Sequence, residues 1–185
     1  MKIAITGGIG SGKSYVCRLL RERGIEVYDC DAAAKRLMRS SEEVKEKISA
    51  LVGADAYTDD GQLNKAVIAK FLLQSDDNAK AINAIVHPAV VTDFLGSGIS
   101  WMESAILYQA GIAHIVDRVI VVTAPEEIRI QRIIQRDNIT REKAQEWIGR
   151  QWSQDEVRRL AHYEIVNDGR PLEPQLTEIL QDINK

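Results

Sequence analysis

The chain has 185 residues, which is the length of one compact domain or of a core with a small insertion. Its composition, 45% hydrophobic and 28% charged, is typical of a globular protein and excludes the disordered and collagen-like classes. A formal net charge of −3 excludes a broadly basic protein, so we expect neither nucleic acid nor a membrane surface as its partner.

The cysteines and the first apolar stretch indicate the compartment. Cys17 and Cys30 form no Cys-x-x-Cys pair, and Cys17 falls within a predicted helix, where it is expected to be a small core residue. The apolar residues 1–6 are too few for a signal sequence or a membrane span. We therefore expect a reducing, cytoplasmic setting, and no pattern in the sequence predicts an oligomeric state.

The first elements predict a parallel βαβ unit. Residues 2–6 form a short apolar run that predicts a buried strand, and glycines follow it. Residues 13–23 predict a helix that Gly24 ends, and residues 25–28 predict a second strand. Two strands joined by a helix in this order imply a right-handed crossover.

A helical stretch follows, too long for a plain crossover. Ser40 and Glu43 have the spacing of a capping box, and residues 59–61 (Asp-Asp-Gly) mark a turn. Helices are predicted over residues 65–74 and 76–86, and Pro88 should break or kink the second. We interpret residues 31–96 as a helical insertion that covers one end of the sheet.

Alternating strands and helices complete the chain. Strands are predicted over residues 99–102, 118–123 and 164–166, and helices over residues 126–136, from Thr140 to about 151, and over 172–183. This order predicts an α/β fold, an open parallel sheet with helices on both faces. The core would comprise residues 1–30, 97–136 and 163–185, with a lid hairpin over 137–162. Such sheets bind ligands beyond the carboxyl ends of their strands.

The strongest signal is the run Gly7-Gly8-Ile9-Gly10-Ser11-Gly12-Lys13-Ser14, which fits the phosphate-binding pattern G-x-x-x-x-G-K-[ST]. It follows a predicted strand and opens a predicted helix. Glycine lets the backbone wrap around phosphate oxygens with its N–H groups turned inward, and the helix N-terminus adds its positive dipole. The lysine would contact the β- and γ-phosphates of ATP, and the serine hydroxyl would bind Mg²⁺. Candidate nucleotide-binding residues here are Gly8, Gly10, Ser11, Gly12, Lys13, Ser14 and the backbone of Tyr15.

Other motifs argue against two classes of protein that bind nucleoside triphosphates. Residues 64–67 lack the final aspartate of a guanine-reading Asn-Lys-x-Asp, which argues against a GTPase switch. Residues 99–103 fit a Walker B strand only in part, which argues against a motor or transport ATPase. Glu103 at its end could hold magnesium through water or cap the next segment, and the sequence leaves both readings open.

Two carboxylates follow the second predicted strand. In an extended segment residues two apart point the same way, so Asp29 and Asp31 could both face the cleft. A phosphoryl transferase needs one acid to accept the proton of the attacking hydroxyl. The alternative is that Asp31 caps the helix that starts after it. The neighbouring phosphate loop favours the catalytic interpretation.

Seven arginines lie between residues 129 and 159. Arg132 and Arg136 share one helix face, a repulsive arrangement that is useful if a polyphosphate lies between them. The other arginines are interleaved with acids, which is also typical of a solvated surface. A mobile hairpin that carries arginines would serve as a lid that excludes water. His87, before Pro88, either marks a helix end or contacts a substrate.

These motifs together resemble the dephospho-coenzyme A kinase family of P-loop kinases, over nearly the whole chain. The matching segments are residues 6–14, 29–31 (Asp-Cys-Asp), 87–88 (His-Pro), 132–137 (Arg-x-x-x-Arg-Asp), Gln151 and 167–169 (Asn-Asp-Gly). The resemblance implies a five-stranded parallel core of the nucleoside monophosphate kinase type. It also implies ATP as phosphoryl donor and dephospho-coenzyme A as acceptor.

The resemblance further implies roles for single residues. Asp31 would activate the ribose 3′-hydroxyl, with Lys13 and Arg136 as the other catalytic groups. Arg132 would lie on the ATP side, and Asn167 and Gly169 at the adenine end. The helical insertion over residues 31–96 would bind the acceptor, and the contacting residues would be Asp29, Lys35, His87 and Leu107.

Four positions depart from the family pattern. Tyr15 replaces a small hydroxyl residue, Lys35 an arginine, Gln109 a glutamate and His162 an aspartate. Lys35 keeps the charge of arginine but loses its bidentate fork. The alternatives are another P-loop kinase with a nucleoside, nucleotide or shikimate-like acceptor, and a P-loop regulatory ATPase that binds a protein partner.

Overall fold

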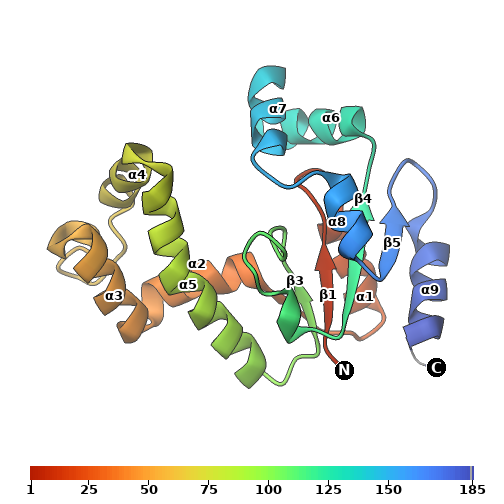
Figure 1. The fold of residues 1–185 in the computed structure, drawn as a ribbon, viewed down its shortest axis with the longest axis horizontal. Coiled ribbons are helices and arrows are strands. Elements are labelled where there is room, and N and C mark those ends of the chain that lie inside the picture. The colour runs from red at the N-terminus through yellow and green to blue at the C-terminus, as the bar shows by residue number, and fades with distance from the viewer. Residues whose placement is uncertain (184) are drawn as a thin grey trace. The chain divides into compact units, whose positions relative to one another are not determined.

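The computed structural model describes residues 1–183 and 185, and the chain divides into two compact units (Figure 1). The first unit comprises Met1–Tyr28 and Ile99–Lys185, and it holds the phosphate loop. The second comprises Asp29–Gly98, which contains the whole of the predicted helical insertion. No helix among these residues is long and apolar enough to cross a membrane.

The sheet has five strands in the order β2-β3-β1-β4-β5. They are β1 (Ile3–Thr6), β2 (Val27–Asp29), β3 (Trp101–Glu103), β4 (Arg118–Thr123) and β5 (Tyr163–Val166). β1 pairs in parallel with β3 and β4, and β4 pairs in parallel with β5. This confirms the predicted open parallel sheet, with strand bounds shifted by up to two residues. β1 is buried along its whole length because an apolar strand at the centre of the sheet is covered on both faces.

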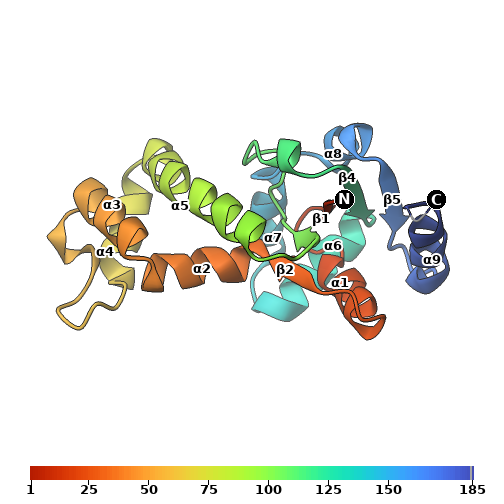
Figure 2. The ribbon, with the colours of Figure 1, turned by 90° about the horizontal axis from the view of Figure 1, so that it is seen from below.

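Five helices accompany the sheet in the first unit, and Figure 2 shows them on both of its faces, as predicted. α1 and α9 lie on one side of the strands and α8 on the other (Figure 2). The helices are α1 (Lys13–Glu22), α6 (Glu126–Asp137), α7 (Arg141–Gly149), α8 (Gln154–Leu160) and α9 (Leu172–Ile183). Thr140 caps α7 as predicted, but α7 ends at Gly149, before residue 151.

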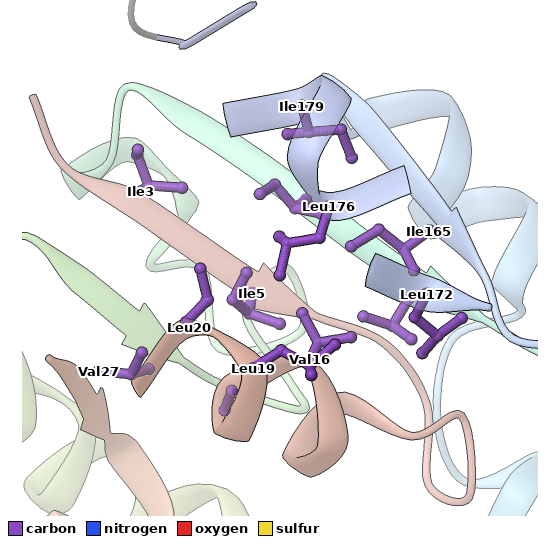
Figure 3. Packing of buried hydrophobic residues seen from close by; sticks show 13 residues of the cluster. Ile3, Ile5, Val16, Leu19, Leu20, Val27, Ile165, Leu172, Leu176 and Ile179 are labelled. Atoms are coloured by element: carbon purple, nitrogen blue, oxygen red, sulfur yellow. The ribbon is translucent and has the colours of Figure 1, made fainter. Parts of the chain in front are cut away.

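The main core lies between the sheet, α1 and α9 (Figure 3). Period-two alternation places Ile3 and Ile5 of β1 on this face. The helices contribute stripes at helical spacing, which on α9 consist of Leu172, Leu176 and Ile179. Cys17 belongs to the same cluster, which confirms it as a core residue. This packing fixes the carboxyl end of β1 and the start of α1, between which the phosphate loop runs.

The second unit is helical. Two local predictions for it are wrong, since Pro88 does not break the helix that contains it and Ser40 does not cap the helix that follows it. Its helices are α2 (Cys30–Ser40), α3 (Glu42–Val52), α4 (Lys65–Gln74) and α5 (Asp76–Gly96). α5 runs through Pro88 because its buried stripe continues at four-residue spacing on both sides of the proline; the stripe is Ile82, Val86, Val90 and Phe94. Ser41, not Ser40, caps α3, since Ser40 still belongs to α2 and donates its hydroxyl hydrogen bond to the Arg36 carbonyl.

Candidate nucleotide-binding site

The phosphate loop joins β1 to α1, and its glycines are needed for two reasons. Gly7, Gly10 and Gly12 have φ angles of 145°, 78° and 101°, which favour glycine. A Cβ on Gly12 would overlap the Asn167 side-chain nitrogen, and one on Gly10 would lie 2.8 Å from the Arg129 carbonyl oxygen. The loop is therefore glycine-rich partly because distant side chains press against it.

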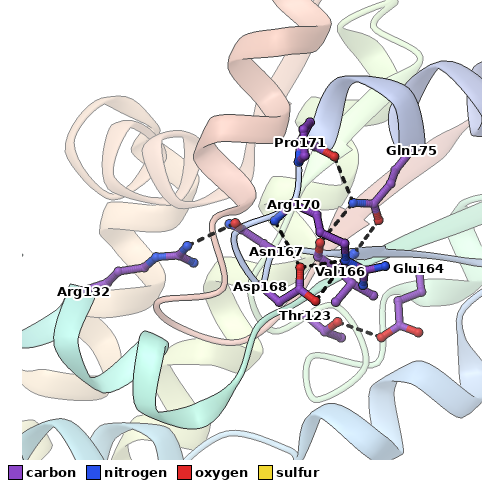
Figure 4. Close-up of polar contacts among 9 residues, drawn as sticks. All are labelled: Thr123, Arg132, Glu164, Val166, Asn167, Asp168, Arg170, Pro171 and Gln175. Atoms are coloured by element: carbon purple, nitrogen blue, oxygen red, sulfur yellow. Dashed lines mark hydrogen bonds and ion pairs between the residues drawn. The ribbon is translucent and has the colours of Figure 1, made fainter.

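Polar side chains hold the carbonyl groups of the loop from outside. Arg129 Nε donates to the Ile9 carbonyl at 2.9 Å, and Arg132 Nη1 donates to the Gly10 and Ser11 carbonyls at 3.2 and 3.3 Å. Asn167 Nδ2 donates to the Ser11 carbonyl at 2.8 Å, and Asn167 Oδ1 accepts from Arg132 at 3.1 Å (Figure 4). These contacts reach the loop from α6 and from the residue after β5.

The inner side of the loop carries groups that fit a phosphate. Ser11 Oγ is the buried side-chain polar atom without a hydrogen-bond partner in the described part of the chain. Among the same residues, the N–H groups of Gly10 and Gly12 donate to no protein acceptor. Buried polar groups are normally satisfied, so the unpaired Ser11 hydroxyl indicates a ligand that accepts hydrogen bonds, and the half-buried Gly10 and Gly12 N–H groups are open to the same ligand. Phosphate oxygens supply that chemistry.

Lys13 begins α1 and is 9% exposed. Its Nζ lies 3.7 Å from a Glu103 carboxylate oxygen at the end of β3. The strand order places Glu103 next to the loop, because β1 and β3 are parallel neighbours whose carboxyl ends meet at one edge. Glu103 thus neutralises part of the Lys13 charge, a role that the sequence reading did not include.

A cleft of about 490 Å³ opens beside the loop. Five of the predicted nucleotide-binding residues line it: Gly12, Tyr15, Arg132, Asn167 and Gly169. The other lining residues are Arg170, Pro171, Leu172 and Glu173. Tyr15 donates its hydroxyl to Glu173 at 3.0 Å, and the Arg18 guanidinium lies 4.6 Å from the Tyr15 ring centre. Backbone hydrogen bonding at Glu173 and the tyrosine hydroxyl lower the pKa of the Glu173 carboxyl. Tyr15 therefore forms one wall of the cleft.

Glutamine side chains form the hydrogen bonds that link residues 150–154, at the end of α7 and after it, to the phosphate loop and to the sheet. Gln151 Oε1 accepts from the Ile9 N–H at 2.7 Å. Gln154 bonds both polar groups of the Ala124 backbone, at 2.9 and 2.8 Å. Gln109, one of the departures, donates to the Arg150 carbonyl at 3.2 Å and accepts from the Trp152 N–H at 3.3 Å. In this structure Gln109 is therefore a link to the hairpin.

The contacts near Gln109 continue with aromatic and apolar side chains. The rings of Tyr108 and Trp152 are stacked, with centres 6.3 Å apart, and Tyr108 donates to the Leu160 carbonyl at 2.8 Å. Leu107 is fully buried and lines a small cavity with Thr6, Gly8 and Gln151. His162, another departure, accepts from the Val119 N–H through Nδ1 at 3.1 Å. That bond joins the start of β5 to β4.

Arg136 is not brought to the loop. It is an exposed residue near the end of α6, and its guanidinium donates to the Asp137 carboxylate at 2.6–3.1 Å. Hydrogen bonds from Arg136 lower the pKa of Asp137. Arg132, one turn earlier, contacts the loop, so the structure separates the two arginines that the sequence analysis grouped.

The predicted acids lie where the second unit begins. Asp29 ends β2 and caps α2, since its Oδ1 accepts from the Ala32 N–H at 2.9 Å. Asp31 lies in the first turn of α2. The expectation of an extended Asp29–Asp31 segment is wrong, because the helix already begins at Cys30, and the cap is Asp29 and not Asp31.

The remaining acceptor candidates belong to the helices of the second unit. Lys35 is exposed on α2. His87 is half-buried inside α5, and burial lowers the pKa of its imidazole. Its place inside the helix excludes the reading of His87 and Pro88 as a helix end.

The sequence analysis missed one functional residue at the loop. Arg129 is 4% exposed and contacts the loop directly, whereas the sequence pattern leaves a functional and a surface role equally open for it. A signal existed, since Arg129 is three residues before Arg132 and therefore on the same helix face.

Comparisons with known proteins decide the family. The family model for dephospho-CoA kinase matches residues 1–173. The chain belongs to the dephospho-CoA kinase family. A dephospho-CoA kinase from Bacteroides fragilis (strain YCH46) is 38% identical over 188 residues, covering 97% of this chain and 91% of the relative. The family is that of the kinases that complete coenzyme A biosynthesis, so the chain is a phosphotransferase.

Solved structures agree with this placement. The crystal structure of TT1252 from Thermus thermophilus has a TM-score of 0.81 and 28% identity, covering 100% of this chain and 96% of the other. A shikimate kinase from Acinetobacter baumannii has a TM-score of 0.57 at 19% identity, covering 99% of this chain and 92% of the other. The second likeness shows a shared P-loop kinase fold.

Proposed function

We propose that this protein transfers the γ-phosphoryl group of ATP to the ribose 3′-hydroxyl of dephospho-coenzyme A, yielding coenzyme A and ADP. The observation that carries the proposal is the phosphate loop, whose Ser11 hydroxyl has no partner among the described residues while its carbonyl groups accept hydrogen bonds from arginine side chains. The loop belongs to a chain of the dephospho-CoA kinase family. A preorganised set of donors is what phosphoryl transfer requires, because its catalysis is mainly positioning and charge stabilisation.

The loop and the start of α1 would hold the triphosphate. The N–H groups of Gly8, Gly10 and Gly12 and the Ser11 hydroxyl surround the β-phosphate, with the Ser14 and Tyr15 N–H groups at the helix N-terminus. Lys13 stabilises the charge that develops on the transferred group. The Ser14 hydroxyl would hold a magnesium ion, which would supply charge neutralisation for the β- and γ-phosphates.

The residues present fit such a magnesium ion. No group of three or more His, Cys, Asp or Glu that could hold a metal occurs among the residues that the structure describes. Mg²⁺ in kinases keeps several waters and is bound by one or two protein ligands plus phosphate oxygens, so it needs no such group. Ser14 is exposed at the start of α1, where a ligand can reach it.

The cleft beside Tyr15 would hold the nucleoside. Arg132, Asn167 and Gly169 line it, and its volume of about 490 Å³ is within the usual range of small-molecule sites. The acceptor would be held by Asp29, Lys35, His87 and Leu107. Because the Asp29 carboxylate already caps α2, it would contact the acceptor with its second oxygen.

Asp31 is the proposed general base. It accepts the proton of the 3′-hydroxyl, whose oxygen forms the new bond to the γ-phosphorus, while the bond to the β,γ-bridging oxygen breaks and ADP leaves. Arg136 would exchange its Asp137 contact for the transferred phosphoryl group when the lid closes. The burial of both cysteines agrees with a cytoplasmic location, which we propose on this ground.

A coupled assay of ADP release tests the function. Purified protein with Mg·ATP should release ADP when dephospho-coenzyme A is added, and the product should carry a 3′-phosphate. Shikimate and nucleosides at the same concentration should give only background, and a rate that no acceptor changes would refute the kinase proposal. Turnover stimulated by a protein partner alone would favour the regulatory ATPase.

The Asp31→Asn variant tests the catalytic role. We expect it to lose at least about 100-fold in kcat, the usual contribution of general base catalysis, with the Kd for Mg·ADP unchanged. Asp55→Asn is the matched control, because Asp55 is an exposed acid of the same unit in a short 3₁₀ turn. Equal kcat values for Asp31→Asn and wild type would exclude Asp31 as the base.

A further inference from the structure

Arg129 is a buried cation that no role described so far requires. It lies one turn into α6 and is 4% exposed. Its Nε donates to the Ile9 carbonyl at 2.9 Å, and among the described residues this is the hydrogen bond that its guanidinium makes. Within the same residues no carboxylate forms an ion pair with it, although Glu126 exerts a weaker attraction.

Such a group is costly. Burial removes the hydration of the guanidinium and lowers the pKa of Arg129. A buried charge is normally paired, because the desolvation penalty of an unpaired ion is several kcal/mol. By contrast, the arginines that do form ion pairs among the described residues are all exposed. Arg129 therefore lacks a paired countercharge among the described residues.

The position of Arg129 identifies that countercharge. A Cβ on Gly8 would overlap its Nη2 atom and lie 3.0 Å from its Cζ atom, so the guanidinium rests on the Gly8 backbone. Ile9 is held from both sides, since its carbonyl accepts from Arg129 and its N–H donates to Gln151. The guanidinium therefore lies against the backbone of the same loop whose Ser11 hydroxyl has no hydrogen-bond partner among the described residues.

We propose that Arg129 is a positioning residue of the nucleotide site and that its buried guanidinium is the electrostatic partner of the bound phosphates. It fixes the orientation of the Ile9 peptide, and its positive charge is compensated when the phosphates of a nucleoside di- or triphosphate occupy the loop. The inference rests on the proposed nucleotide site but not on the identity of the acceptor. It goes beyond the motif itself, which contains no arginine.

The proposal predicts a coupling between occupancy and stability. In the empty protein the Arg129 charge is unfavourable, and in the occupied protein it is favourable. Neutralising it should therefore leave the stability of the empty protein almost unchanged and weaken phosphate binding. A purely structural clamp predicts the reverse, because losing the Ile9 hydrogen bond would destabilise the empty protein and leave phosphate affinity intact.

The test compares Arg129→Gln, Arg129→Lys and Arg118→Gln with wild type. Arg118 is an exposed residue at the start of β4, at the opposite end of the strand from the phosphate loop, and its substitution makes the same change in net charge. Kd for Mg·ADP is measured by calorimetry without any acceptor, and melting temperature is measured with and without Mg·ADP.

We expect Arg129→Gln to raise the Kd for Mg·ADP about tenfold, because it removes one positive charge several ångströms from a polyanion in a partly dehydrated site. Arg129→Lys should stay within about threefold of wild type because it keeps the charge, and Arg118→Gln should match wild type. Salt should weaken binding less steeply in Arg129→Gln than in wild type.

Two results overturn the proposal. One is a wild-type Kd in Arg129→Gln; the other is a loss of melting temperature in its empty form with an unchanged ligand-induced shift. Failure of the proposed function is a separate result, since wild type would then bind Mg·ADP without phosphorylating dephospho-coenzyme A.

Discussion

Replacement of Gly12 by alanine tests how the loop is held. Gly12 has a φ of 101°, and a Cβ there would lie less than 3.0 Å from the Asn167 side-chain nitrogen. The left-handed backbone costs an L-residue about 1–2 kcal/mol. Asn167 must also move, which breaks its bonds to the Ser11 carbonyl and to Arg132, at about 0.5–1.5 kcal/mol each. The total expected loss in the free energy of unfolding is about 2–5 kcal/mol.

Gly24→Ala is the matched control. Gly24 has a φ of 77° and no atom within 4 Å of the position of an added Cβ. Alanine there therefore costs only the strain of a left-handed backbone and displaces no side chain. Urea denaturation should show Gly12→Ala less stable than Gly24→Ala by about 1–3 kcal/mol, the worth of the two broken bonds. Calorimetry should show weaker Mg·ADP binding only in Gly12→Ala. Equal losses of stability in the two variants, with equal Kd values, would refute the Asn167 contact.

Three further predictions concern the core, the sheet edge and the second unit. Leu176→Ala should lower the free energy of unfolding by about 2–5 kcal/mol in urea, since Leu176 is fully buried in the main core; a loss below 1 kcal/mol would contradict that packing. Gln175→Leu should cost about 1–3 kcal/mol in urea, because the Gln175 amide bonds both polar groups of Val166 on the edge strand (Figure 4); an unchanged urea midpoint would mean that water replaces those bonds. His87 has a lowered pKa in the folded protein, so the unfolded chain takes up the proton first and stability falls as the pH drops below 6.5. Urea midpoints at pH 7.5 and 5.5 should therefore differ less in His87→Asn than in wild type, and parallel losses would contradict the burial of His87.

The order of the elements could be predicted because local signals agree with the global fold. The strand at residues 118–123 and the helices at residues 65–74 and 172–183 have the predicted bounds. Apolar runs, capping residues and glycine stops all indicate the same structure there. The position of the phosphate loop could be predicted for the same reason, since the spacing of its glycines, lysine and serine is a local signal between a strand and a helix.

Errors occur where tertiary packing decides. Pro88 is tolerated inside α5 because the buried stripe continues beyond it, and a stripe that packs against three helices outweighs one lost backbone hydrogen bond. The Asp29–Asp31 segment was read as extended, but Asp29 caps a helix that begins one residue later. Both choices lie between two locally acceptable conformations, and a sequence pattern cannot rank them.

The loop motif alone does not explain why this backbone becomes an anion site. Three side chains bond the carbonyls of residues 9–11 from outside, and they lie 120, 122 and 156 residues away in the chain. Each bonded carbonyl fixes the plane of its peptide and therefore the direction of the next N–H group. Within the described residues, the Gly10 and Gly12 N–H groups are left without protein acceptors, so they are available to phosphate. Binding strength should therefore depend as much on Arg129, Arg132 and Asn167 as on the glycines. Loss of the Arg129 charge, or of the hydrogen-bonding group of Arg132 or Asn167, should weaken phosphate binding while the motif stays intact.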